Sequence, residues 1–285
     1  MSKEIELEDE LGDVLEKAMK NAGLTEELLA ERTGIAVGKI KDAEDYRYDF
    51  TPEEIAALAQ ILGLNEAGLR KLNEEAYPRP ALRGLPFELH VLAMPFGVGV
   101  VNAYVLSIHG SGKGILFDTG KNFEDLKTKW PTSVRDLQAV FLTHWDRDHA
   151  GGLSGLLQAY EVPRIYAPQG PGTETTLLNG GEQIELGDFS IQVFDTPGHV
   201  SNHNSYLVSL SSKPQCGSVL IAGDLVFAGS VGGAFYSGEH LLHNVQWILS
   251  EVDGETVVAP GHGPLTTVAN ERTYNPFYRA GEGKE

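Results

Sequence analysis

The sequence contains very little cysteine: Cys216 is the single one among 285 residues. No disulfide can therefore form within the chain, which excludes the disulfide-stapled folds of small secreted proteins. Cys216 follows Ser-Ser-Lys-Pro-Gln, a stretch that predicts a surface turn, so we expect an inert thiol and not a nucleophile. The first residues, MSKEIELEDELG, have neither the basic nor the apolar stretch of a signal peptide. Together these features predict a cytoplasmic protein.

Basic residues and long apolar runs are also scarce. Lys and Arg number 22 against 40 Asp and Glu, a formal net charge of -18. A chain this acidic repels phosphate backbones, so nucleic-acid binding would need a local basic face. The longest apolar stretch, 218–235, has Asp224 near its centre and several glycines, which favours a buried strand and loop over a membrane span. We therefore expect neither a membrane nor a nucleic acid as partner.

Residues 1–76 contain a helical pattern and predict a small all-α domain. The first apolar residues fall on one face of a helix: Leu11, Val14, Leu15, Ala18 and Met19. Thr25 and Thr51 are typical N-caps, each followed by acidic residues, and they predict two further helix starts.

The order of these elements resembles the helix-turn-helix domain of the phage-repressor (XRE) family. The resemblance lies in GLTEELLAERTGI at 23–35, in Ile40 and Glu44, and in Leu-Gly-Leu at 62–64. It implies a recognition helix at 36–44, but that segment, AVGKIKDAE, lacks the Ser, Gln, Asn and Arg that contact DNA. Residues 1–76 hold 9 Lys and Arg against 19 Asp and Glu, a net charge of -10. We predict that this domain docks or forms a homodimer and does not bind DNA.

The pattern changes after residues 77–84, YPRPALRG, which hold two prolines and predict a linker. Short apolar runs then predict strands at 100–108, 114–117, 139–142, 191–194, 206–210, 219–221 and 256–259. Helical patterns lie at 152–160 and 239–250. This alternation predicts a layered α/β or α+β domain over 85–285.

Potential metal ligands follow several of these predicted strands. The segment LTHWDRDHAGG at 142–152 places four His and Asp side chains within six residues. DTPGH at 195–199, Gly223-Asp224 and PGHGP at 260–264 follow three further strands. Imidazole and carboxylate groups are the usual nitrogen and oxygen ligands of zinc and similar ions, so this arrangement favours a metal site.

Residues from about 85 to 279 resemble the metallo-β-lactamase superfamily. The matching residues are Asn102-Ala103-Tyr104, Asp118-Thr119-Gly120, Thr143–His149, Thr196–His199, Asp224 and Gly261-His262-Gly263. The segments 227–232 and 261–277 look like the short branch near glyoxalase II. The resemblance implies an α+β fold: an αββα sandwich with metals at one edge, preceded here by the helix-turn-helix-like domain.

The resemblance also implies two metal sites that share one carboxylate. The expected ligands are His144, Asp146 and His199 in one site, Asp148, His149 and His262 in the other, and Asp224 between them. Asp148 and Asp224 would act as the catalytic carboxylates beside a metal-bound hydroxide that attacks a carbonyl carbon. One or two divalent ions are expected, with zinc as the first candidate and manganese or iron as alternatives.

Position 146 departs from the family pattern, which has His there. An additional carboxylate would make the site a weaker Lewis acid and raise the pKa of its bound water. It would also favour manganese or iron over zinc, because carboxylate is a harder ligand than imidazole. The alternative is that Asp146 binds zinc just as the histidine does.

Two more side chains are candidates for contact with the substrate: His203, four residues after His199, and Tyr236, which follows a glycine-rich loop. Glyoxalase II-like relatives have Arg, Thr and Asp where this chain has Gly-Ala-Phe at 233–235, which disfavours a glutathione-linked substrate.

The function predicted first is a metal-dependent hydrolase of a small ester, thioester or lactone. The alternative enzyme is a persulfide dioxygenase-like oxygenase with one iron bound by His144, His199 and Asp224. A further alternative is a regulator in which the metal domain senses a ligand and the helical domain binds a partner or DNA.

Overall fold

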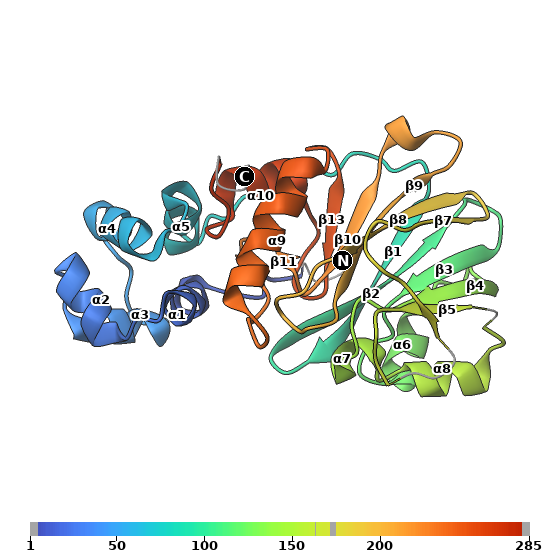
Figure 1. Cartoon of the computed structure of the whole chain (residues 1–285), viewed down its shortest axis with the longest axis horizontal. Helices are drawn as coiled ribbons and strands as arrows, with labels where there is room; N and C mark the ends of the chain where they lie inside the picture. Colours follow the sequence, from blue (N-terminus) through green and yellow to red (C-terminus); the bar gives the residue numbers. More distant parts are fainter. Residues whose placement is uncertain (1–4, 163, 172–174, 281–285) are drawn as a thin grey trace.

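The computed structural model describes residues 5–162, 164–171 and 175–280, so the outer ends of the two predicted domains lie outside the described residues. Five helices form a lobe at the left of Figure 1, beside a larger sandwich of sheets and helices. The helices of the lobe are α1 (Leu11–Ala22), α2 (Glu26–Thr33), α3 (Val37–Glu44), α4 (Pro52–Leu62) and α5 (Glu66–Asn73). The predicted caps are confirmed, since the Thr25 hydroxyl accepts from Leu28 N and the Thr51 hydroxyl accepts from Glu54 N.

Two six-stranded sheets form the centre of the larger unit. The first sheet contains, in spatial order, β1 (Glu88–Phe96), β2 (Gly99–Ser107), β3 (Lys113–Phe117), β4 (Asp136–Phe141), β5 (Ile165–Ala167) and β6 (Thr176–Leu177). The second contains β14 (Thr266–Thr267), β13 (Val257–Pro260), β10 (Val219–Gly223), β9 (Asn204–Leu210), β8 (Phe189–Asp195) and β7 (Gln183–Leu186). A small hairpin, β11 (Val226–Phe227) and β12 (Ser230–Val231), follows β10. All the predicted strands are present. The strands β1, β5, β6, β7, β11, β12 and β14 were not predicted, and all of these except β1 are only two to four residues long.

Helices cover the outer face of each sheet (Figure 1). The first sheet carries α6 (Phe123–Lys129), α7 (Arg147–Ala150) and α8 (Leu153–Ala159), and the second carries α9 (Gly238–Glu251) and α10 (Val268–Tyr274). A 3-10 turn, Pro214–Cys216, connects β9 to β10 and leaves Cys216 exposed, as predicted. The layers therefore confirm the predicted αββα sandwich and its α+β class.

The alternation of side chains along the strands explains the layers. In β2, Tyr104 and Leu106 point into the core between the two sheets, whereas Ala103 and Val105 join the core beneath α6 and α8. Successive side chains of a strand point to opposite faces, so a strand buried on both faces reads as a continuous apolar run. This is why the strands were easy to predict and the face of each residue was not.

A third core joins the helical lobe to the sandwich. It contains the buried side chains of α1–α5 together with those of β10, α9 and α10. The contact is close, because a Cβ atom on Gly68 would lie only 1.9 Å from the carbonyl oxygen of Tyr274. Tyr77, at the start of the predicted linker, is buried, and its hydroxyl donates to the Glu271 carboxylate (2.9 Å). The lobe is thus packed firmly onto the sandwich.

The apolar stretch 218–235 forms β10, β11 and β12 with their loops and is largely buried, as predicted. Within the described part of the chain, no helix combines the length and the apolar character needed to cross a membrane.

Candidate metal centre

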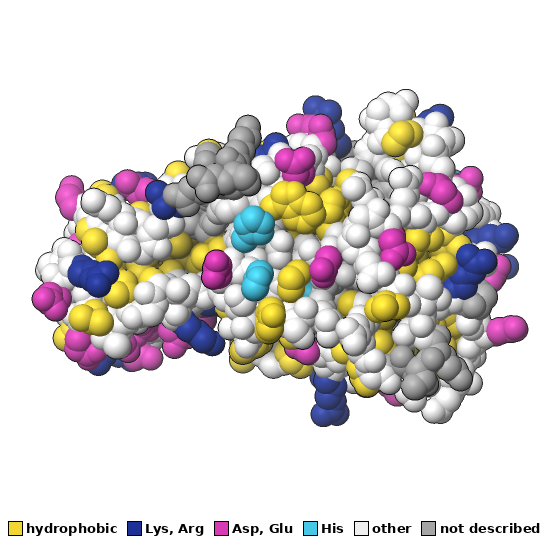
Figure 2. Space-filling view, in the orientation of Figure 1, with side chains coloured by type: hydrophobic (Ala, Val, Ile, Leu, Met, Phe, Trp, Pro, Cys, Tyr) yellow, Lys and Arg dark blue, Asp and Glu magenta, His cyan; other side chains and the backbone are white. Residues whose placement is uncertain are grey.

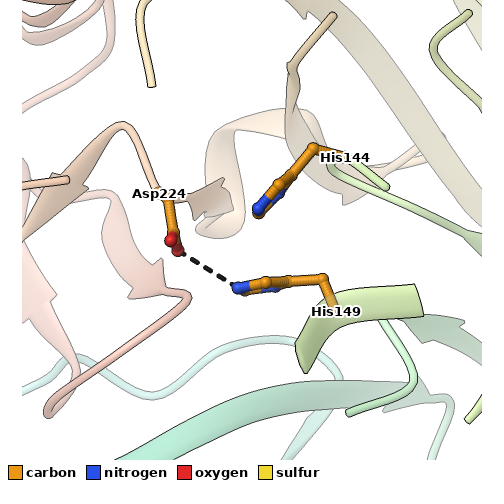
Figure 3. Close-up of side chains that lie close together, drawn as sticks. All are labelled: His144, His149 and Asp224. Atoms are coloured by element: carbon orange, nitrogen blue, oxygen red, sulfur yellow. Dashed lines mark ion pairs between the residues drawn. The ribbon is translucent and has the colours of Figure 1, made fainter. Parts of the chain in front are cut away.

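The predicted metal ligands meet at one edge of the sandwich, where several strands end. His144 follows β4, His199 follows β8, Asp224 follows β10 and His262 follows β13. His149 lies on α7, the short helix that begins directly after Asp146. Figure 3 shows His144, His149 and Asp224 pointing toward one another. Residues more than 100 positions apart in the sequence thus form one cluster, because the strand ends of both sheets lie side by side.

The first group consists of His144, Asp146 and His199, whose ligand atoms all lie within 4.8 Å of one another. Asp146 Oδ2 is 3.8 Å from His144 Nε2 and 3.4 Å from His199 Nε2. Two ligands of one tetrahedral ion, each about 2.0–2.2 Å from it, lie about 3.4 Å apart. The separations in this group therefore fit a shared cation.

The second group consists of Asp148, His149 and His262, with Asp148 Oδ2 3.7 Å from His149 Nε2 and 3.3 Å from His262 Nε2. Asp224 lies between the two groups. Its Oδ1 is 3.3 Å from His149 Nε2, and its Oδ2 is 3.4 Å from His199 Nε2 and 3.6 Å from His262 Nε2. The geometry thus brings all seven predicted ligands together as two sets joined by one carboxylate.

Hydrogen bonds to the Nδ1 atoms fix the direction of the four histidines. Nδ1 of His149 donates to Asp118 Oδ2 (2.9 Å), that of His199 to Gly233 O (2.7 Å), and that of His262 to Val100 O (2.9 Å). His144 Nδ1 lies 3.0 Å from the Thr143 hydroxyl. With Nδ1 protonated, each ring presents the lone pair of Nε2 to the interior of the site, which is the form that binds a metal ion.

Asp118 organises this outer layer, a role that the sequence did not reveal. Its carboxylate accepts from His149 Nδ1, from the backbone N of Thr143 (2.8 Å) and from the Thr143 hydroxyl (2.8 Å). The Thr143 hydroxyl gives its proton to Asp118, so it accepts from His144. Asp118 is buried and has a φ of 58°, a left-handed conformation that Asp and Asn tolerate better than most residues.

Polar atoms without hydrogen bonds mark the centre of the site. His144 Nε2, His149 Nε2 and Asp224 Oδ1 are buried and have no hydrogen-bond partner among the described residues, although His149 Nε2 and Asp224 Oδ1 face each other as an ion pair at 3.3 Å (Figure 3). Burial without a partner costs about 1–3 kcal/mol for a group such as His144 Nε2. Lone pairs and a carboxylate that converge in this way would be satisfied by cations, so the residues present fit one or two metal ions.

The electrostatics of the cluster agree with that fit. Burial, reinforced by the nearby His149, holds the pKa of His144 well below its usual range. Burial opposes the ionisation of Asp224, but His149 and His262 outweigh it and hold the pKa of that carboxyl well below its usual range. Burial also lowers the pKa of His149, yet Asp224 and Asp118 raise it well above its usual range. A cation that binds here would therefore compete with a proton on His149.

Gly261 allows the strand ends to come this close. A Cβ atom at this position would lie 2.1 Å from Asp224 Oδ1 and 2.7 Å from His149 Cε1. No side chain fits there without displacing a ligand, which explains the glycine before His262 in physical terms.

His203, a predicted substrate contact, lies behind the ligands. It is fully buried, its Nδ1 is 2.8 Å from the Thr196 hydroxyl, and its Nε2 accepts from the backbone N of Asp224 (3.1 Å). Burial, with a smaller effect from His199, lowers its pKa to about 3, so the ring stays neutral. Both ring nitrogens are engaged within the protein, which favours support of the Asp224 backbone over contact with substrate.

Tyr236, the other predicted substrate contact, lies at the mouth of the site. Its backbone N donates to the carbonyl oxygen of His199 (3.1 Å), and its ring, 55% exposed, stacks on His240. Phe235 is 73% exposed and packs edge-on against the His199 ring, with centroids 5.2 Å apart. Two large aromatic side chains are thus partly open to solvent beside one ligand.

The N-terminal segment also reaches the site, and sequence reasoning missed it. Glu8 Oε1 lies 3.7 Å from His262 Nδ1, and the Asp9 carboxylate accepts from the Ser230 hydroxyl. No motif carries this information, because Glu8 and His262 stand at opposite ends of the chain.

The comparisons with known proteins point to one family. The model of the Metallo-beta-lactamase superfamily matches residues 96–262. An uncharacterized protein of Aquifex aeolicus is 31% identical over 67% of this chain and 97% of its own length. The probable metallo-hydrolase YqgX of Bacillus subtilis is 29% identical over 65% of this chain and 95% of its own. The hydroxyacylglutathione hydrolase of Hahella chejuensis is 30% identical over 44% of this chain, and the match spans only 48% of that relative.

Two solved structures are similar in fold and in sequence. The BLEG-1 B3 metallo-beta-lactamase is 29% identical, with a TM-score of 0.51 over 67% of this chain and 98% of its own. The protein TTHA1623, solved in a di-iron-bound form, is 28% identical, with a TM-score of 0.51 over 65% of this chain and 98% of its own. These matches leave about a third of the chain without a counterpart.

Proposed function

Since the chain belongs to the metallo-beta-lactamase superfamily, we propose that it is a metal-dependent hydrolase of a small ester, thioester or lactone. One observation carries the proposal: two complete sets of three ligands share Asp224, and their metal-binding atoms point inward. A hydrolase that uses two ions needs such a pair of sites around one reacting water.

The residues of the chain have separate tasks in this proposal. His144, Asp146 and His199 would hold one ion and Asp148, His149 and His262 the other, with Asp224 in contact with both. When bound, divalent ions supply Lewis acidity and lower the pKa of water. Asp118 and Thr143 orient the two histidines after β4, and His203 holds the backbone of Asp224. Asp148 and Asp224 would be the carboxylates that accept a proton from the attacking water.

Zinc is the first candidate for the ion, with manganese and iron as alternatives. The ligand set of four imidazoles and three carboxylates suits all of them. The related structure in a di-iron-bound form supports two ions per chain and iron as one of the candidate metals. Asp146 shifts the balance toward the harder ions, because it replaces an imidazole by a carboxylate.

The proposal also names a class of substrate and a residue that binds it. The match to a hydroxyacylglutathione hydrolase supports a thioester, because the named substrate joins an acyl group to the glutathione sulfur. Tyr236 and Phe235 offer aromatic surface beside His199, which would contact the part of the substrate next to the scissile bond. We propose Tyr236 as a substrate-binding residue on this ground.

The test measures metal content and activity together. Protein purified without added metal is analysed for its elements and assayed on a panel of small esters, thioesters and lactones. We expect close to two ions per chain and hydrolysis of at least one class. Asp224→Ala should abolish that activity, whereas Cys216→Ser should leave kcat/KM unchanged, because Cys216 is exposed and outside the site.

Two outcomes would contradict the proposal. A single iron per chain, with oxygen consumed in the presence of a persulfide, would identify an oxygenase that uses His144, His199 and Asp224 alone. Full hydrolysis by Asp224→Ala would show that the reaction does not depend on the paired ligand sets.

A further inference from the structure

Helix α1 of the lobe runs along the mouth of the metal centre. Lys17 Nζ lies 5.5 Å from the ring centroid of Phe227, and that ring lies 5.5 Å from the ring of His262. Lys20 Nζ lies 5.4 Å from the ring centroid of Phe235, which in turn packs on His199. Residues three apart on a helix are neighbours on one face. One face of α1 therefore covers two aromatic rings, each in contact with a metal ligand of a different set.

Buried contacts hold α1 in this place. Lys17 Nζ donates to the Asp9 carboxylate and to the carbonyl oxygen of Val231 (2.7 Å). Asp9 also accepts from the Ser230 hydroxyl, so the segment before α1 is tied to the hairpin that follows Asp224. Leu15 and Met19 are buried in the core that the lobe shares with α9. Since Lys17 is committed to these bonds, its charge is already matched within the protein.

Lys20 differs from the other lysines of the lobe. Lys17, Lys39, Lys41 and Lys71 each form an ion pair with a carboxylate. Lys20 is exposed, and within the described ranges its ammonium group has no ion-pair partner, only the ring of Phe235. In a lobe with this excess of acidic residues, an unmatched cation at the mouth of the site is an exception that function can explain.

We propose that α1 is one wall of the active site and that Lys20 binds an anionic substituent of the substrate. The inference rests on the proposed hydrolase function and names its substrate class: an ester or thioester that carries a negative charge beside an apolar part. The apolar part contacts Phe235 and Tyr236, which are exposed next to His199. The negative charge would otherwise meet Asp146, which is 45% exposed at the same edge. An ammonium next to Phe235 offsets that repulsion and selects the orientation of the substrate.

The experiment compares cleavage of the same acetyl ester in two probes, the anion 4-acetoxybenzoate and its neutral methyl ester. Lys20→Met should lower kcat/KM for 4-acetoxybenzoate about two- to fivefold, mainly through a higher KM, as expected for an exposed ion pair. Hydrolysis of the neutral methyl ester should not change. Added salt should reduce the difference in kcat/KM for 4-acetoxybenzoate between the parent and Lys20→Met. Lys20→Arg, which keeps the positive charge, should have most of the parent's kcat/KM for this probe. Lys129→Met, at an exposed position of α6 on the outer face of the first sheet, removes the same charge and should leave kcat/KM for both probes unchanged.

The outcomes separate the two proposals. Equal losses on both probes, or no loss on either, would overturn the role of Lys20 while the hydrolase function stands. If neither probe is hydrolysed, the acid product 4-hydroxybenzoate is titrated onto the metal-loaded parent and onto Lys20→Met by calorimetry. Binding weakened in the variant supports the anion site even without hydrolysis, and equal affinity refutes it.

Discussion

Replacing Asp118 by Asn tests whether this buried carboxylate orients His149 for metal binding. Asn tolerates the left-handed backbone at this position at least as well as Asp, so the change adds no strain to the main chain. The carboxylate accepts three hydrogen bonds: two at Oδ2, from His149 Nδ1 and the Thr143 hydroxyl, and one at Oδ1, from Thr143 N. An amide has only one acceptor atom, so its NH2 group must face at least one of these donors.

The structure sets the expected size of the effect. The arrangement that costs least places the NH2 group against Thr143 N and keeps the oxygen for His149 and the Thr143 hydroxyl. One buried N–H group then lacks an acceptor, which should lower the free energy of unfolding of the metal-free protein by about 1–3 kcal/mol. The loss of the negative charge makes His149 a weaker ligand, and metal affinity should fall about 10–100-fold.

Two assays separate these effects: urea unfolding in the presence of a chelator, and competition for zinc against a chromophoric chelator. Asp136→Asn, which neutralises an exposed carboxylate on β4, serves as the matched control and should change neither quantity. Metal affinity equal to that of the parent would refute the orienting role of Asp118, whatever happens to stability.

Four further predictions concern the metal preference, the docking of the lobe, a buried carboxyl group and DNA binding by the helical lobe. Asp146→His should raise the zinc content relative to manganese and iron, and identical metal ratios in parent and variant purified side by side would contradict the hard-ligand argument. Gly68→Ala should lower the free energy of unfolding by about 1–3 kcal/mol, because its Cβ would lie 1.9 Å from a carbonyl oxygen of α10. Gly38→Ala should not lower the free energy of unfolding, because its Cβ would meet nothing within 4 Å. Equal urea midpoints for the two variants would therefore argue against tight docking of the lobe. Burial raises the pKa of Glu271 although Gly229 N and the Thr266 hydroxyl donate to it, so its contribution to stability is present at low pH and is lost as the pH rises through the folded-state pKa. The stability of Glu271→Gln relative to the parent should therefore increase from about pH 4 to pH 8, and parallel pH profiles in chemical denaturation would show that the carboxyl is not perturbed. The full chain should bind no duplex DNA specifically at physiological salt, since the lysines of α3 pair with Glu54 and Glu27 and acidic side chains line the lobe (Figure 2). Sub-micromolar binding to a selected sequence that survives physiological salt would overturn this expectation.

The amino-acid sequence alone was enough to predict the sandwich and the seven candidate metal ligands that the structure brings together. Both depend on short-range patterns: apolar runs that are buried on both faces become strands, and a ligand motif directly after a strand must lie at the edge of its sheet. The segment 142–152 holds four ligands in one turn and a short helix, so their proximity follows from chain connectivity. The helix caps at Thr25 and Thr51 could also be predicted, because each depends only on the few residues that follow it.

The tertiary structure decided what surrounds those ligands. Asp118 stood in a recognised motif, but its bond to His149 depends on how the loop after β3 meets α7. His203 could have faced the substrate, yet the packing of β9 against β10 turned it toward the backbone of Asp224. Lys20 had no signal at all, because its place depends on the docking of α1 against a loop more than 200 residues away. Periodicity and motifs report the neighbours of a residue along the chain, whereas contacts across a docked surface depend on the shape and burial of both partners, which no local pattern records.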